Sequence, residues 1–117
     1  MSNRALQKIF SQNIATLISY IYKNDCSCTL GEAFIPTKLA QARKEDRPIK
    51  THFDRMALDL NIYKKDSEEL VTCREYEKFG RYWETLNTLN RAGCFFKVVN
   101  INHFDMCVKN FNTRLRL

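Results

Sequence analysis

The chain has 117 residues, of which 44% are hydrophobic and 27% charged, and this composition fits one compact domain over residues 1–117. Its 19 Lys and Arg against 13 Asp and Glu give a formal net charge of +6, which favours anionic partners such as nucleic acid, acidic lipid or a cell-wall polymer. No segment approaches the roughly 20 consecutive apolar residues of a membrane span, and the start MSNRALQKIF has no apolar block with a cleavage site, so we expect cytoplasmic synthesis without a signal peptide.

Hydrophobic spacing predicts the first elements of the chain. Apolar side chains recur every three or four residues over 3–23, which indicates an amphipathic helix. The run CSCTLGEAF at 26–34 is short and bounded by turns, and we interpret it as a strand. Pro36 opens a second helix, since proline fits the first helical turn. That helix ends before Pro48, because the residue preceding a proline is disfavoured in the helical region.

The middle of the chain predicts a strand, a hairpin and a helix. Residues 55–63 alternate between apolar and other side chains, with period two, which indicates a strand. Residues 64–72 are polar and then apolar again, a pattern that suits a hairpin or a strand edge. Aromatic and leucine side chains at helical spacing predict a third helix over 74–90, with an aromatic buried face.

Two further strands are expected near the C-terminal end. One is CFFKVV at 94–99, and the other is 103–108, with a turn around 100–102 between them. This order of elements indicates an α+β fold. We expect a single small domain in which about three helices pack on a small, mainly antiparallel sheet.

The histidines and one aspartate are the candidate chemical groups. His52 and His103 are the two histidines of the chain, and each begins the pattern H-F-D at the edge of an apolar strand. Asp59 follows His52 by seven residues inside a largely apolar strand. A buried carboxylate needs a compensating cation, either a metal ion or an arginine such as Arg55. Two imidazoles and one carboxylate form the three-ligand set of a catalytic zinc site; surface histidines with a salt-bridged Asp59 are the alternative.

Four motifs follow one another in a fixed order. They are T-L-G-E-A-F at 29–34, T-H-F-D-R-M-A-L-D-L-N at 51–61, Y-E-K-F-G-R-Y-W at 76–83 and N-H-F at 102–104. In these motifs the chain resembles the D-alanyl-D-alanine carboxypeptidase and L-alanyl-D-glutamate endopeptidase family of zinc peptidases, in its short phage-encoded, endolysin-like branch. The resemblance covers nearly the whole chain and implies a zinc-dependent hydrolase of peptidoglycan peptides.

The resemblance also implies a site and a place of action. It implies that His52, Asp59 and His103 hold Zn²⁺, which polarises a peptide carbonyl and activates a water. It implies action at the cell wall, which phage lysis enzymes reach through a separately encoded membrane pore. A positively charged protein would meet an anionic wall favourably.

Three positions depart from the family pattern. Asn100 stands where the family has an acidic general base, and an amide cannot take a proton at neutral pH. Ile35 replaces an arginine that stabilises the oxyanion or the substrate, and Lys50 replaces a serine. Asp105 shares a strand face with His103, which makes it a candidate substitute for the base; Asp54, two residues after His52, is the other.

These departures leave two interpretations of the same site open. One is a zinc peptidase of weakened activity, with Lys50 and Arg55 as its candidate substrate-binding cations. The other is a catalytically inactive zinc-binding relative that acts as a binding or inhibitory module on a wall fragment or a host protein. A small basic nucleic-acid-binding protein is a lesser alternative, supported by the net positive charge. Against it, the basic residues are dispersed among acidic ones and form no recognition-helix pattern.

Overall fold

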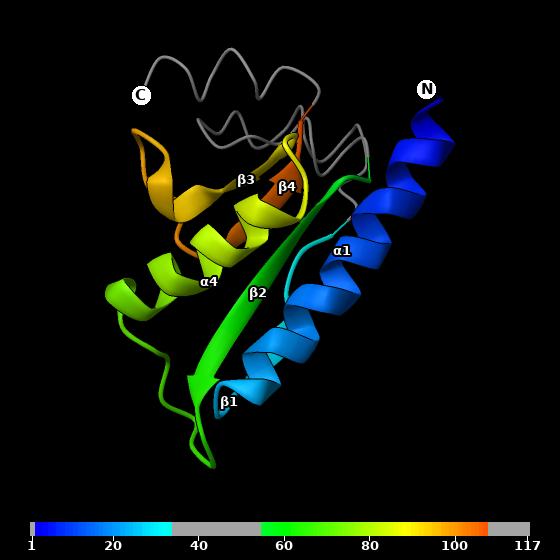
Figure 1. Ribbon diagram of the computed structural model, residues 1–117. Helices are drawn as coiled ribbons and strands as arrows, with labels where there is room; N and C mark the ends of the chain where they lie inside the picture. Colours follow the sequence, from blue (N-terminus) through cyan, green and yellow to red (C-terminus); the bar gives the residue numbers. More distant parts are fainter. Residues whose placement is uncertain (1, 34–54, 108–117) are drawn as a thin grey trace.

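The computed structural model describes residues 2–33 and 55–107 (Figure 1). Its elements are α1 (Asn3–Lys23), β1 (Cys26–Leu30), β2 (Ala57–Lys64), α4 (Cys73–Leu86), β3 (Asn90–Ala92), the 3₁₀ turn η1 (Gly93–Phe95) and β4 (His103–Met106). The described strands form one antiparallel sheet in the order β1-β2-β4-β3. The expected α+β class with an antiparallel sheet is therefore confirmed. Two α-helices belong to the described ranges, and the helix expected to begin at Pro36 lies outside them.

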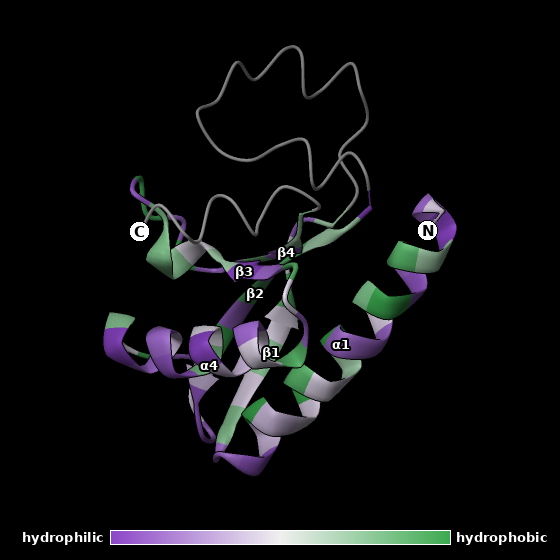
Figure 2. Ribbon diagram, turned by 45° about the horizontal axis from the view of Figure 1, so that its top comes forward, coloured by the Kyte–Doolittle hydropathy of each residue, from purple (hydrophilic) through white to green (hydrophobic). Residues whose placement is uncertain are grey.

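Both helices begin at polar caps that the sequence supplies. The Ser2 side chain accepts a hydrogen bond from the Ala5 amide at 3.1 Å, which satisfies one of the free amides at the start of α1. Thr72 and Glu75 form a reciprocal capping box at the start of α4. Hydrophobic and hydrophilic segments alternate with the turns of α1 (Figure 2). Neither α1 nor α4 is long and apolar enough to cross a membrane.

The two helices pack on the same face of the sheet, and this is where the hydrophobic core lies. Apolar side chains of β2 and β4 belong to one buried cluster with those of α1 and α4. Trp83 of α4 is completely buried at its centre. Its ring lies edge-on to Phe10 at 5.7 Å and to Phe104 at 6.1 Å between centroids. The aromatic face predicted for this helix is thus core packing.

The predicted strand at 94–99 is wrong. Gly93–Phe95 form a 3₁₀ turn, and residues 96–100 belong to no helix or strand. The Gly93 carbonyl accepts hydrogen bonds from the amides of Phe96 at 3.2 Å and Asn100 at 2.9 Å, so the chain closes a loop here. A Cβ on Gly93 would lie 2.1 Å from the Asn100 carbonyl oxygen, which only glycine avoids. The strand of this region is β3, immediately before the loop.

The other predicted elements differ at their ends. The strand expected at 26–34 ends at Leu30, and the helix expected to run to Asn90 ends at Leu86, where Asn87 is already extended. The expected hairpin at 64–72 is a single bridge between Tyr63 and Leu70. The strands expected at 55–63 and 103–108 are present as β2 and β4.

Candidate functional site

The sheet pairs two of the predicted zinc ligands. Asp59 on β2 and His103 on β4 are direct partners in the antiparallel register. Asp59 Oδ1 lies 3.3 Å from His103 Nδ1. Asp59 is 5% exposed and His103 is fully buried. Two polar side chains 44 residues apart in the sequence therefore meet in a buried setting. They lie on the face of the sheet opposite the hydrophobic core.

A second carboxylate lies on the other side of the imidazole. Asp105 follows His103 by two residues on β4 and shares its face, as the period of a strand predicts. Its Oδ2 atom lies 2.6 Å from His103 Nε2. Arg91 on β3 is the register partner of Asp105 and donates to both of its oxygens, from Nε at 2.8 Å and from Nη2 at 2.9 Å. Asp59, His103, Asp105 and Arg91 thus form a row of groups across three strands.

These neighbours govern protonation within the row. Burial acts to lower the pKa of His103, but hydrogen bonds and charges of Asp105 and Asp59 outweigh it and raise that pKa above 6.5. Burial acts to raise the pKa of Asp105, but His103 and Arg91 outweigh it and lower that pKa below 3.8. Both shifts favour a protonated His103 imidazole beside an ionised Asp105 carboxylate.

The spacing between Asp59 and His103 fits a zinc ion. Zinc bonds to nitrogen and oxygen are about 2.0–2.2 Å long, so two ligand atoms at a tetrahedral angle lie about 3.3–3.6 Å apart. The observed separation of Oδ1 and Nδ1 is 3.3 Å. A neutral imidazole protonated at Nε2 would direct its Nδ1 lone pair at the Asp59 carboxylate, which is unfavourable unless a cation lies between them. A proton or a metal ion satisfies that requirement.

The T-L-G-E-A-F motif contacts Asp59 from the side of β1. The Gly31 amide donates to the Asp59 carbonyl at 2.7 Å, and the Asp59 amide donates to the Glu32 carbonyl at 2.8 Å. A Cβ on Gly31 would lie 3.0 Å from Asp59 Cβ, so glycine permits this close approach. This part of the motif positions the backbone of a predicted ligand.

The loop before β4 covers the other end of the row. The Phe96 ring lies 4.8 Å from Arg91 Cζ and 5.7 Å from the His103 ring. Asn100 accepts a hydrogen bond at its carbonyl from the His103 amide at 3.1 Å, so it closes the turn into β4. The base position of the motif pattern therefore lies three residues before the predicted ligand His103 and is hydrogen-bonded to its backbone.

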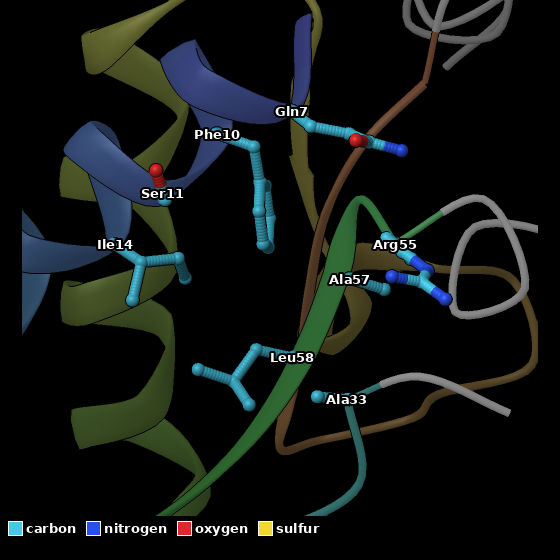
Figure 3. Close-up of a pocket in the computed structure, with 8 residues that line it drawn as sticks. All are labelled: Gln7, Phe10, Ser11, Ile14, Ala33, Arg55, Ala57 and Leu58. Atoms are coloured by element: carbon cyan, nitrogen blue, oxygen red, sulfur yellow. The ribbon is translucent and has the colours of Figure 1, made fainter. Parts of the chain in front are cut away.

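Arg55 lies apart from this row, at an exposed turn before β2, with φ of 61°. It lines a cavity of about 340 Å³ between α1 and the start of β2, where Phe10 and Ile14 face Leu58 (Figure 3). Asp59 Oδ1 lies 3.3 Å from His103 Nδ1, so a protonated His103 is one cation available to this carboxylate. His52, Asp54, Lys50 and Ile35 lie outside the described residues.

The row contains Asp59, His103 and Asp105, which the sequence had singled out, together with Arg91, which it had not; Phe96 beside Arg91 was also not singled out. Within residues 2–33 and 55–107, no group of three or more His, Cys, Asp or Glu side chains suited to holding a metal ion is found. Those ranges contain Asp59 and His103 but not His52, the third predicted ligand. The sequence matches no protein-family model and no curated protein.

Proposed function

We propose that this chain is a zinc-dependent hydrolase of peptidoglycan peptides, weakened by Asn100 at the base position. The observation that carries the proposal is the 3.3 Å separation of Asp59 Oδ1 and His103 Nδ1 in a buried setting, which fits two ligands of one zinc ion. His52 as third ligand, and peptidoglycan peptides as substrate, rest on the motif resemblance. The net charge of +6 is compatible with an anionic wall.

Each described residue has a distinct part in this proposal. A zinc ion held there would supply Lewis-acid polarisation of a carbonyl and activation of a water. Asp59 contributes one anionic oxygen, and His103 contributes Nδ1 after losing a proton from it. Asn100 can orient a water by hydrogen bonding but cannot accept its proton, and general-base catalysis contributes about 10²- to 10⁴-fold in rate.

Metal content tests the site first. Protein purified without added metal is measured by elemental analysis beside Asp59→Asn and His103→Ala. We expect about one zinc per chain in the wild type and a loss in both variants, because each lacks a ligand. Asp66→Asn is the matched control for Asp59→Asn, since it removes the same charge from an exposed turn. A folded wild type that takes up no zinc even when zinc is offered contradicts the proposal.

Asn100→Asp then tests the chemistry, because it restores a carboxylate with little change in size. Zinc-loaded wild type and variant are compared on muropeptides by chromatography of the products. We expect slow cleavage by the wild type and a rise of about 10²- to 10⁴-fold in the variant.

The same experiment decides the second candidate, a zinc-binding module without turnover. The amide at Asn100 favours it, because the base position lacks a basic oxygen. Zinc binding with no cleavage by either protein would support the module and contradict the hydrolase.

A further inference from the structure

The ion pair between Arg91 and Asp105 lies on the side of His103 that faces away from Asp59, so it is outside the predicted ligand set. We propose that Asp105 and Arg91 are positioning residues that hold the His103 imidazole with Nδ1 directed at Asp59. The inference rests on the proposed function in one respect, since it assumes that Nδ1 is the atom offered to the metal.

The hydrogen-bonding capacity of Asp105 fixes the role of each imidazole nitrogen. An ionised carboxylate only accepts hydrogen bonds, so His103 Nε2, 2.6 Å from Asp105 Oδ2, is the donor of that contact. The ring cannot turn over without breaking this charge-assisted bond in a fully buried setting. Nδ1 is therefore the nitrogen left for the cation beside Asp59.

Arg91 in turn fixes Asp105. Its guanidinium contacts both carboxylate oxygens in the planar, two-bond arrangement that gives strong geometric preference. Trp83 Nε1 lies 3.1 Å from the Arg91 carbonyl and 3.0 Å from the Asp105 carbonyl, and donates to both. The buried tryptophan of α4 thereby ties the backbones of β3 and β4 together beneath the ion pair.

Phe96 completes the arrangement by covering the cation. Its ring lies against the Arg91 guanidinium and the His103 ring, so the guanidinium gains a cation–π contact and Arg91 is only 16% exposed in its side chain. Exclusion of water lowers the local dielectric constant, which strengthens the contacts within the row.

This geometry favours a positioning role for Asp105 over the role of substitute base. Both of its oxygens already accept hydrogen bonds from Arg91, and Oδ2 also contacts His103. The carboxylate lies at Nε2, whereas the atom directed at Asp59 is Nδ1. A water activated on the Nδ1 side of the ring would therefore be on the opposite side from Asp105.

Zinc affinity provides the first test, by competition with a chelator. Partners that orient a metal-bound histidine typically contribute about 10- to 100-fold to metal affinity, so we expect Asp105→Asn and Arg91→Met to bind zinc about 10- to 100-fold more weakly. Lys97→Met is the matched control for Arg91→Met, because it removes the same charge from an exposed residue between β3 and β4. Folding of each variant is checked by circular dichroism. Wild-type affinity in folded Arg91→Met and Asp105→Asn overturns the inference.

A metal-free measurement separates this inference from the proposed function. In ¹⁵N-labelled protein without zinc, we expect a His103 Nε2–H resonance protected from solvent exchange, lost in Asp105→Asn and broadened in Arg91→Met. Absence of this resonance from the wild type, or its persistence in both variants, overturns the positioning role. A wild type that shows the resonance and responds to both variants, yet binds no zinc, contradicts the proposed function alone.

Discussion

Gly31→Ala is expected to disturb the candidate site through the backbone of Asp59. The new methyl group would lie 3.0 Å from Asp59 Cβ and 3.1 Å from the Asp59 carbonyl oxygen. Carbon atoms in contact prefer separations of about 3.5–4.0 Å, so the two strands must move apart by about 0.5–1 Å. The hydrogen bond from the Gly31 amide to the Asp59 carbonyl, 2.7 Å long, opposes that movement.

Overpacking of this kind typically costs about 1–3 kcal/mol in the free energy of unfolding. Movement of Asp59 also lengthens its 3.3 Å separation from His103, so we expect zinc affinity to fall with stability. Urea unfolding of the metal-free protein and chelator competition measure the two effects. Ser27→Ala on β1, the strand that precedes Gly31, is the control and should stay within about 0.5 kcal/mol of the wild type. Wild-type stability and wild-type zinc affinity in Gly31→Ala would refute this reasoning.

Three further predictions concern groups around the sheet. Asp105 and Asp59 raise the pKa of His103 above 6.5 despite its burial. The protonated imidazole therefore stabilises the metal-free fold fully below pH 6.5, and this contribution to the free energy of unfolding is lost as the pH rises through the folded-state pKa. Urea unfolding at a series of pH values measures it, and unchanged stability over that range would contradict the prediction. Tyr76 accepts from the Ile62 amide at 2.9 Å and donates to the Leu60 carbonyl at 3.1 Å, so Tyr76→Phe should cost about 1–3 kcal/mol, and an effect no larger than that of Tyr63→Phe, whose side chain is half-buried on β2, would count against it. Burial raises the pKa of Cys94 to about 12, and because the thiolate is the nucleophile, mass spectrometry should find Cys94 alkylated much more slowly than the exposed Cys73; equal rates would exclude a protected thiol.

The sequence alone determined the elements whose signal is local. The spacing of apolar residues predicted α1 over the same residues, 3–23, that the structure gives it, because a helix buries one face of a continuous segment. Period two predicted β2, and the same period placed Asp105 on the face of His103. These predictions need only neighbours in the chain.

Only the tertiary structure decided which distant groups meet. The apolar run at 94–99 fits a strand by composition, but Gly93 accepts two backbone hydrogen bonds and closes a loop there instead. Arg91 carried no local signal, since its partner Asp105 becomes its neighbour only through the pairing of β3 with β4. The 3.3 Å contact of Asp59 with His103 likewise follows from the register of β2 against β4. Register depends on which faces of paired strands are buried together, and the pattern of one strand does not say which distant strand is its partner.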